Sequence, residues 1–561
     1  KEGWLYFTKE SFDLLYPSYG DTYPTYMGAV GMTYEQAGNG RAGLGIQTDE
    51  GEVLTLKDRA IHHMTTGLST VEISSKNAEK LNTEFRKFFD NSNLNYKSYV
   101  LKNGNDDKMN RLKKLLDTHE IRYENAKTGT IKGYNYNTQE EGKFNVNNSD
   151  LVIHTNQPKG KMVKVLFEPN AKLADSLTYD ITAWSLPYAH GLNAIASKSS
   201  VNSSKNKSTR AVTNTMDASA YAYISKWNSL DDATFLSALL QNNIVPRFTE
   251  KEFSTNGKSF NKGTLIILRN DNRNSDFDAK LIAIANKHHR KLTPASTGFV
   301  SSGVDFGSYS VKPINKQKVA VLSGQGTSSL SFGEIWHFFE MQLQYPITNI
   351  NSRDFGTTDL NNYDVIILPN GYYKSLLNKT TLNKVKKWTR SGGTLIAIGN
   401  ALNSFADKEG FSLKTKKTNE NADNKEEDQK DNLTPFEDRE RKSIGNLITG
   451  SIFKSTIDNS HPMAFGYDST YFSLKLSGMA YNYLNEGYNV AYFDKETKNV
   501  SGYAGSKAVK EVPESLLFGE EPMGSGSLVY MVDNTLFRAF WENGKLFIAN
   551  AVFFLNSDKL K

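Results

Sequence analysis

The clearest periodic pattern of apolar residues lies between residues 54 and 94. In LTLKDRAIHHMTTGLSTV, apolar residues recur every three or four positions, which places them on one face of a helix. They are Leu56, Ala60, Met64, Leu68 and Val71. Thr55 with Asp58 three residues later resembles a capping box. The pattern therefore predicts a mostly helical segment that begins at this cap.

A short apolar segment rich in tyrosine and glycine precedes this helix. Its last part, GAVGMTYEQAG, is closed by glycine and predicts a buried strand that carries one carboxylate, Glu35. A general base needs a rigid mount, and a strand end that faces a cleft would provide one. The other interpretation is a solvated carboxylate at the end of a strand, and the pattern alone favours it.

The middle of the chain contains two similar stretches, which start at Ser98 and Ala220. Each has a short apolar run, a pair of aspartates, an amphipathic helical pattern and a strand-like segment. A third unit of this kind starts with KVAVLSGQG at Lys318. Alternating strand and helix patterns predict parallel α/β layers. The similarity could come from duplication of one ancestral unit. The alternative is that all β-α-β units have similar sequence patterns.

Several polar features have simple structural interpretations. Two aspartate pairs stand where helices should begin, so we interpret them as caps favoured by the helix dipole. They are Asp106 with Asp107 and Asp231 with Asp232. Neighbouring histidines on a helix point apart and make poor chelates, which applies to His62 with His63 and to His288 with His289. The polar segments 196–214 and 414–432 predict flexible loops.

Composition narrows the possible classes of function. The chain has 561 residues, no cysteine, and 67 Lys and Arg against 61 Asp and Glu, a formal net charge of +6. The basic residues are scattered, which does not suggest a nucleic-acid partner. No apolar run reaches the roughly 18 residues that a membrane span needs. The absence of cysteine excludes disulfides, thiolate metal sites and a cysteine nucleophile.

The stretch YPSYGDTYP, followed by GMTYEQAG and the predicted helix, resembles the C-terminal half of the zinc carboxypeptidases of the carboxypeptidase A type. In that family a flexible tyrosine caps the substrate and a glycine follows four residues later. A strand then carries the catalytic glutamate, and a long helix closes the domain. Tyr16, Gly20 and Glu35 come in this order, and Tyr19 is a second candidate for the capping phenol. The resemblance implies that Glu35 takes a proton from a zinc-bound water.

Later stretches resemble the large bacterial members of this family, which carry a long C-terminal extension. They are NQPKGKMVKVLFEPN, SLTYDITAWSLPYAHGLNA and AFWENGKLFIANAVFF.

The main departure from the family's pattern concerns the metal ligands. The family binds zinc through a His-x-x-Glu pair and a distant histidine, and binds the substrate through arginines, all of which precede the tyrosine. Residues 1–15 contain neither His nor Arg, so we expect a fragment whose zinc ligands lie before Lys1.

A His-x-x-Glu sequence does occur later in the chain, as HFFE from His337 to Glu340, and His461 follows it. Residues three apart share a helical face and could share a metal ion. The aromatic neighbours of this motif, and its place after Glu35, instead favour a surface histidine or one with ordinary hydrogen bonds. We therefore assign no metal ligand within this chain.

The third unit resembles a class I glutamine amidotransferase-like domain, which has a flavodoxin-like sheet. KVAVLSGQG, YDVIILPNG and SGGTLIAIGNA fit its strands. In active members a nucleophilic cysteine follows the last of these strands at a tight elbow. Gly399, Asn400 and Ala401 stand there instead. The resemblance therefore implies a degenerate structural or binding domain, whose carboxyl sheet edge could hold a small ligand or a glycan.

These patterns and resemblances predict an α/β protein with three regions. Residues 1–95 are expected to form the second half of a carboxypeptidase-type domain, and residues 96–312 to form α/β layers. Residues 316–561 are expected to form the amidotransferase-like domain, with a polar insertion near 412–440.

Two functions follow from this organisation. The first is a zinc-dependent metallocarboxypeptidase that removes C-terminal residues from peptides, with Glu35 as general base and Tyr16 or Tyr19 at the substrate. This chain alone would be inactive, and its partners would be the peptide and the segment or chain that carries the zinc ligands. The second is a non-catalytic protein that recognises a surface glycan or a partner protein. The resemblance to the bacterial members implies a secreted or periplasmic location.

Overall fold

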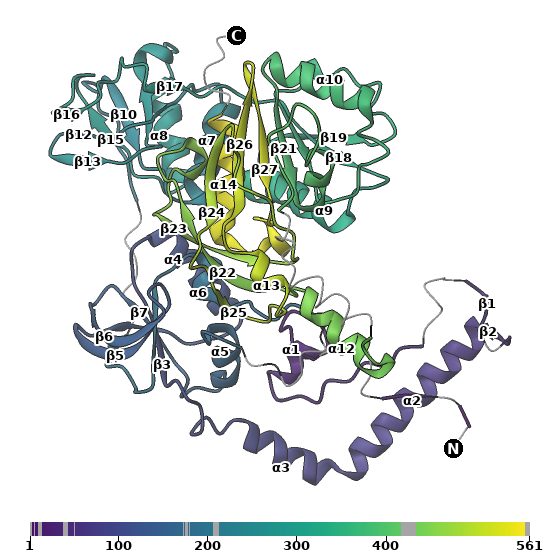
Figure 1. Cartoon of the computed structure of the whole chain (residues 1–561). Helices are drawn as coiled ribbons and strands as arrows, with labels where there is room; N and C mark the ends of the chain where they lie inside the picture. Colours follow the sequence, from purple (N-terminus) through teal and green to yellow (C-terminus); the bar gives the residue numbers. More distant parts are fainter. Residues whose placement is uncertain are drawn as a thin grey trace.

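The computed structural model places most of the chain in a body of packed sheets, from which a long helical arm projects (Figure 1). It describes residues 3–4, 6–8, 14–36, 43–49, 51–171, 173, 178, 180–205, 212–416 and 433–555. The predicted loop at 196–214 lies partly outside these residues, and the one at 414–432 lies mostly outside them. The predicted α/β class is confirmed.

The arm consists of two consecutive helices, α2 (Leu56–Lys76) and α3 (Ala78–Phe88). The predicted capping box is confirmed. The Thr55 hydroxyl accepts a hydrogen bond from the Asp58 backbone N–H, and the Asp58 carboxylate accepts one from the Thr55 backbone N–H. Every residue of both helices keeps part of its surface exposed. The short elements that precede α2 are α1 (Thr22–Thr25), β1 (Gly45–Gln47) and β2 (Val53–Thr55).

The predicted buried strand in GAVGMTYEQAG is wrong for the residues that are described. Its described part belongs to no helix or strand and is mostly exposed. The segment lies along α2, because the Tyr34 hydroxyl is 2.6 Å from the Thr70 hydroxyl and Gln36 Oε1 is 2.7 Å from His62 Nδ1. A strand needs backbone bonds to a neighbouring strand, whereas these contacts join side chains to a helix.

Residues 98–204 form a first unit around a seven-stranded sheet. Its central elements are β3 (Ser98–Leu101), α4 (Asp106–Thr118), β4 (Glu124–Ala126), β7 (Leu151–His154), α5 (Gly160–Phe167) and β8 (Ala194–Ser197). The strands stand in the order β8-β3-β7-β4, which is the order of a ferredoxin-like, split β-α-β unit. The added elements are β5 (Gly129–Asn135), β6 (Glu140–Val146), α6 (Leu186–His190) and β9 (Ser203–Ser204).

Residues 222–313 form a second unit with the same strand order, β15-β10-β14-β11. Its central elements are β10 (Ala222–Ser225), α7 (Leu230–Gln241), β11 (Arg247–Thr249), β14 (Leu265–Leu268), α8 (Phe277–Lys287) and β15 (Thr293–Ala295). The added strands are β12 (Phe253–Thr255), β13 (Lys258–Phe260), β16 (Ser302–Gly303) and β17 (Val311–Pro313). Equal topology in both units agrees with the similarity of their sequence patterns.

The prediction of parallel layers is wrong for these two units. In the first, β3 pairs with β7 and β8, and in the second, β10 pairs with β14 and β15, always in the antiparallel sense. The strand after the first helix, β4 or β11, runs parallel to the first strand of its unit, β3 or β10. An antiparallel strand, β7 or β14, lies between the two. The local alternation of strand and helix is the same in both arrangements, so the pattern could not distinguish them.

A buried ion network joins the two units. Arg290, which follows α8, donates two bonds of 2.7 Å to the Asp107 carboxylate of α4 and one of 2.8 Å to Asp232 of α7. Asp232 caps α7 together with Ser229, as predicted. Asp107 is not a cap, because Asn105 caps α4. Arg290 outweighs the effect of burial and holds the pKa of Asp107 well below its usual range.

The C-terminal region is built on a ten-stranded mixed sheet. Five parallel strands stand in the order β19-β18-β20-β21-β27, the predicted flavodoxin-like order. They are β18 (Val319–Ser323), β19 (Ile347–Asn351), β20 (Val365–Leu368), β21 (Thr394–Ile398) and β27 (Gly526–Met531). Antiparallel strands continue the sheet, namely β22 (Ser451–Ile457), β23 (Thr470–Lys475), β24 (Tyr488–Phe493), β25 (Asn499–Ser501) and β26 (Ser515–Met523).

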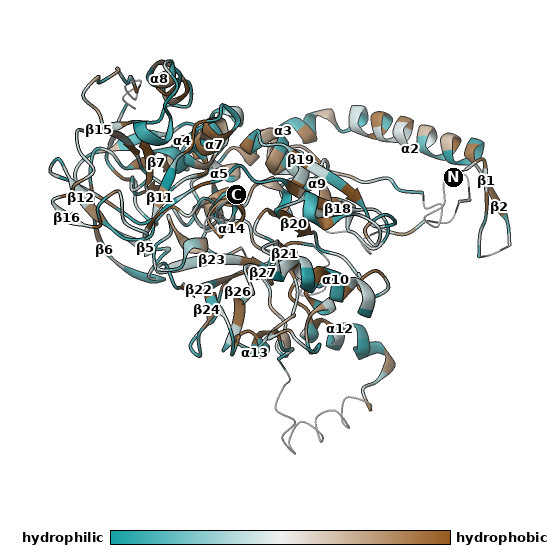
Figure 2. Ribbon diagram, turned by 90° about the horizontal axis from the view of Figure 1, so that it is seen from above, coloured by the Kyte–Doolittle hydropathy of each residue, from teal (hydrophilic) through white to brown (hydrophobic). Residues whose placement is uncertain are grey.

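The helices of this region pack beside the sheet. They are α9 (Ser329–His337), α10 (Lys379–Arg390), α12 (Arg439–Ser443), α13 (Ala508–Glu511) and α14 (Lys545–Phe553). All nine residues of α14 are buried, as expected for a helix that is apolar on almost every side. In Figure 2, by contrast, apolar and polar residues alternate along the projecting α2. Among the described helices, none is both long and apolar enough to cross a membrane.

Candidate functional site

Glu35 lies in the irregular segment beside α2. Its neighbours Tyr34 and Gln36 both contact that helix, and Glu35 between them is exposed. Within the described part of the chain, no ion pair or hydrogen bond engages the Glu35 carboxylate. The carboxylate is therefore accessible, but on an irregular segment rather than on the predicted strand.

Tyr16 and Tyr19 lie against the rest of the body. Tyr16 is 4% exposed, and its ring centroid is 5.8 Å from that of Trp184. The Tyr19 hydroxyl donates to Asp180 Oδ1 at 3.0 Å, and the Tyr16 backbone N–H donates to Asp180 Oδ2 at 3.3 Å. Burial raises the pKa of both phenols. No contact among the described residues joins either phenol to Glu35, so their role at a substrate stays a prediction.

The zinc implied by the resemblance does not fit the described residues. Among them, no group of three or more His, Asp or Glu side chains could hold a metal ion. In the HFFE motif, Glu340 accepts a bond of 2.6 Å from the Trp336 indole N–H. His461 Nε2 lies 2.8 Å from Oε2 of Glu520 on β26, and both side chains are buried. Glu340 and His461 thus have ordinary partners, and His337 Nδ1 lies 3.3 Å from Gln342 Nε2.

The position of the predicted degenerate elbow follows β21. Gly399 has φ +58°, and a Cβ there would lie only 2.8 Å from the Asn370 side-chain oxygen. That oxygen accepts a hydrogen bond of 2.8 Å from the Asn400 backbone N–H. The turn thus requires a left-handed backbone conformation at this position, which glycine adopts without strain. It presents amide groups and no nucleophile.

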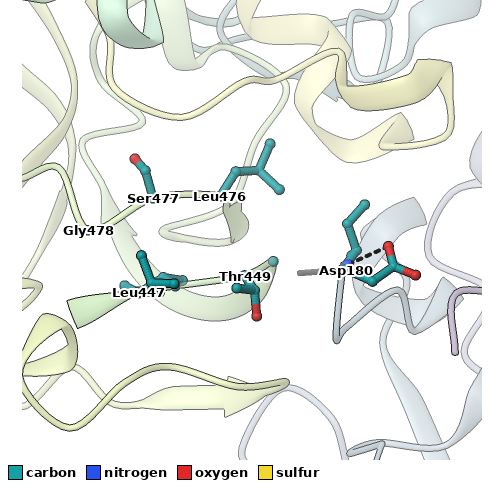
Figure 3. A pocket seen from close by; sticks show the side chains of 9 residues that line it. Asp180, Leu447, Thr449, Leu476, Ser477 and Gly478 are labelled. Atoms are coloured by element: carbon teal, nitrogen blue, oxygen red, sulfur yellow. Dashed lines mark hydrogen bonds between the residues drawn. The ribbon is translucent and has the colours of Figure 1, made fainter. Parts of the chain in front are cut away.

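A cavity of about 290 Å³ lies between Asp180 and loops of the C-terminal region (Figure 3). Thr449 and Ser477 line its opposite wall, and the Thr449 hydroxyl is buried with no partner among the described groups. Burial raises the pKa of Asp180, whose oxygens already accept from Tyr16, Tyr19 and the Ile181 N–H. Asp180 therefore belongs both to the wall of this cavity and to the contact with the N-terminal tyrosines.

A larger cavity, of about 650 Å³, has Tyr16 in its wall, and we call it the Arg538 cleft. Its walls come from residues 16–23, the second half of α4, α5, residues 184–190 and residues 538–542. Its volume is within the range of small-molecule sites. Five segments that are distant in sequence thus form one cavity.

Three cationic side chains and one carboxylate line the Arg538 cleft: Arg111, Lys114, Arg538 and Glu542. Arg111 binds Asp231 at 2.5 Å and lies 3.7 Å from Glu542. Burial would raise the pKa of Glu542, but the charges of Lys545 and Arg111 outweigh burial and lower it. The carboxylate is thus neutralised locally, and the cleft keeps a surplus of positive charge.

His190 is a buried titratable group of the cleft, with 5% of its surface exposed. Its Nδ1 atom is buried and has no hydrogen-bond partner among the described groups. Burial lowers the pKa of His190 to about 4, so the ring is neutral near pH 7. Native proteins rarely leave a buried polar atom unpaired, which makes this ring a candidate to contact a ligand.

Arg538 is held by an unusual backbone. Arg538 and Ala539 have φ +46° and +59°, a left-handed conformation that costs of order 1–2 kcal/mol per residue outside glycine. Glu334 holds the turn by accepting a bond of 2.7 Å from the Arg538 backbone N–H. The guanidinium lies over the Tyr16 ring, 4.8 Å from its centroid. This strain places the Arg538 side chain at the cleft.

Reasoning from sequence missed the Arg538 cleft. The stretches SLTYDITAWSLPYAHGLNA and AFWENGKLFIANAVFF, which supported the family resemblance, supply two of its walls. The high density of aromatic residues in these two stretches was the only sequence feature that pointed to a site there. No pattern linked them to α4 or to Tyr16, because that contact exists only in the folded chain.

Solved structures that resemble this chain match only part of it. No model of a known protein family matches it. No curated protein matches it either. Similar solved structures include a ThuA-like protein from Bacteroides uniformis, with 10% identity, a TM-score of 0.26, and coverage of 42% of this chain and 89% of that chain.

Two further solved structures resemble a similar share of the chain. A glutamine amidotransferase from Thermotoga maritima has 7% identity and a TM-score of 0.24, and the match covers 40% of this chain and 77% of that one. A beta-galactosidase from Bacillus circulans has 11% identity and a TM-score of 0.26, with 43% and 31% covered. At these scores the likenesses carry no argument about function.

Proposed function

We propose that the natural polypeptide containing this chain is a zinc-dependent metallocarboxypeptidase, and that Glu35 is the base that takes a proton from the attacking water. One observation carries this proposal. An exposed carboxylate, without a partner among the described residues, stands between two residues that contact the capped helix α2. Glutamate and helix follow each other in the order that the resemblance implies.

The exposed apolar face of α2 supports the same proposal. Met64, Leu68 and Val71 are 59%, 63% and 68% exposed. A one-sided apolar stripe normally packs on another surface, because burial of apolar area is favourable. In a complete carboxypeptidase-type domain, the remainder of that domain would cover this face.

The proposal assigns no metal step to this chain, since its described residues do not fit zinc. What the chain supplies is a proton acceptor. As the water oxygen attacks a peptide carbonyl, the water must lose a proton, and a carboxylate within hydrogen-bond reach can accept it. The same carboxylate can then return the proton to the leaving amine.

The test is peptide hydrolysis by the natural polypeptide and by its Glu35→Gln variant. Release of C-terminal residues is measured by chromatography, and we expect a loss of kcat of about a hundredfold or more. Glu79→Gln on α3, another exposed glutamate, is the control and should keep the rate. Equal rates for Glu35→Gln and the parent polypeptide would remove Glu35 from the mechanism.

A second candidate is non-catalytic recognition of a surface glycan or a partner protein. The separate placement of the predicted site residues favours it, since Tyr16 and Tyr19 contact Asp180 while Glu35 lies beside α2. Absence of peptidase activity in the natural polypeptide, with binding retained, would support it over the first. A secreted or periplasmic location is part of both proposals.

A further inference from the structure

The Arg538 cleft is lined by both cationic and apolar side chains. Arg538 and Lys114 carry its unpaired positive charge, because no carboxylate within the described residues forms an ion pair with either of them. Its apolar lining includes Trp184, Leu115 and Leu166. A ligand complementary to both parts would be an anion with an apolar body.

The geometry of Arg538 favours a carboxylate. A guanidinium is planar and presents paired N–H donors that match the two oxygens of a carboxylate. The Tyr16 and Tyr19 rings, with centroids 4.8 and 5.6 Å from the guanidinium carbon, support the group by cation–π contact. The guanidinium also hydrogen-bonds the Tyr16 and Tyr19 hydroxyls, and because it has five N–H donors, further donors remain for a ligand.

His190 adds a third element deeper in the cleft. It is 95% buried, and its Nδ1 has no partner among the described groups. A neutral imidazole can accept a hydrogen bond at one nitrogen and donate at the other. It therefore suits a ligand with an amide next to its carboxylate.

We propose that the Arg538 cleft binds a small carboxylate with an apolar body. Its carboxylate lies on Arg538 and Lys114, its apolar part lies against Trp184 and Leu115, and an adjacent amide bonds His190. This site is separate from Glu35 and does not depend on peptide hydrolysis. The carboxylate could belong to a free small acid or to the C-terminus of a peptide.

The first test is calorimetric titration of the whole chain with N-acetylphenylalanine and with its uncharged amide. We expect saturable binding of the acid, and binding of the amide at least tenfold weaker. No saturable binding of the acid, or equal binding of acid and amide, would overturn the proposal. A peptide that ends in phenylalanine with a free carboxylate is the second probe. Tighter binding of the peptide would assign the cleft to chain ends, and tighter binding of the acid to free acids.

Variants locate the binding. Arg538→Gln should weaken binding of the acid at least tenfold, whereas Arg353→Gln, an exposed arginine that does not line the cleft, should leave it unchanged. Because Arg538 lies on a strained turn, Lys114→Gln provides a second variant at an exposed position of α4, with an expected loss of several fold.

Two more variants separate binding from folding and from hydrolysis. His190→Leu removes the unpaired imidazole, so we expect a thermal midpoint at least equal to that of the parent together with weaker binding. Glu35→Gln should bind the acid as the parent does, which keeps this proposal distinct from the hydrolase. Unchanged affinity in both Arg538→Gln and His190→Leu would show that the acid does not bind in this cleft.

Discussion

Helices α2 and α14 lie in opposite environments. α2 has 21 residues and none of them is buried, whereas all nine residues of α14 are buried. Figure 1 shows α14 inside the body and α2 on the arm. α14 is apolar on nearly all sides, and α2 has a single apolar stripe.

The difference shows what periodicity alone can establish. The spacing of apolar residues determines which face of a helix prefers contact, but it does not supply the contacting surface. α14 finds that surface in Phe518 and Tyr467, whose ring centroids lie 4.8 and 4.0 Å from that of Phe547. The stripe of α2 remains exposed among the described residues. The predictions below test whether this contrast holds in solution.

The largest effect is expected for a core substitution in α14. Phe547→Ala should lower the free energy of unfolding by about 4 kcal/mol, because it removes buried area and leaves a cavity. Leu68→Ala on α2, where the side chain is 63% exposed, should change it by less than about 0.5 kcal/mol. Urea unfolding measures both. A large loss at Leu68 would mean that the face of α2 is covered in solution.

The next effect compares ion pairs of the body and of the arm. Arg290→Met should lower the free energy of unfolding by about 3 kcal/mol, because it leaves the buried Asp232 without its ion pair and Asp107 with Lys226 alone. Lys76→Met breaks the exposed pair with Glu72 on α2 and should have no measurable effect. Thermal midpoints of the two variants provide the measurement, and equal shifts would contradict the contrast.

A third effect appears on acidification. The pKa of His190 is about 4 in the folded chain and 6.5 without burial, so the unfolded chain takes up a proton first as the pH falls. Stability is therefore lost between pH 6.5 and 4, and we expect a loss of about 2 kcal/mol from this group between pH 7.5 and 5.

Denaturant unfolding of His190→Leu at both pH values tests this. The variant should lose about 2 kcal/mol less than the parent on acidification. His63→Leu, at an exposed position on α2, is the control and should follow the parent. A variant His190→Leu that loses as much stability as the parent would show that the ring is not buried in its neutral form.

The smallest effect concerns the helix caps. Thr55→Ala removes the cap of α2 and should weaken that helix by about 1 kcal/mol, seen as faster hydrogen exchange of its amides, with the unfolding midpoint unchanged. Ser229→Ala removes the buried cap of α7 and should lower the midpoint itself. A midpoint shift from Thr55→Ala would tie α2 to the cooperative body.

Several features could be predicted because they depend on neighbouring residues. Thr55 with Asp58 marked the start of α2, and Ser229 with Asp232 forms the same motif in α7. The apolar runs near Val319, together with the resemblance, predicted the flavodoxin-like strand order. Capping and strand runs involve residues within a few positions of each other, so the sequence displays them directly.

Other features depend on contacts across the chain. The antiparallel pairing of β3 and β10, the Arg290 network and the five segments of the Arg538 cleft join residues far apart in sequence. The same local patterns would suit parallel layers. Nothing in the sequence near Glu35 indicates that its segment packs along α2.

The sequence by itself determined the α/β class, the capping box of α2 and that helix with its apolar stripe, since each follows from short-range patterns. The tertiary structure decided which strands pair, which charges are buried, and that Tyr16 joins Arg538 rather than Glu35. The physical reason is that burial and electrostatics depend on surfaces that come together only when distant segments pack.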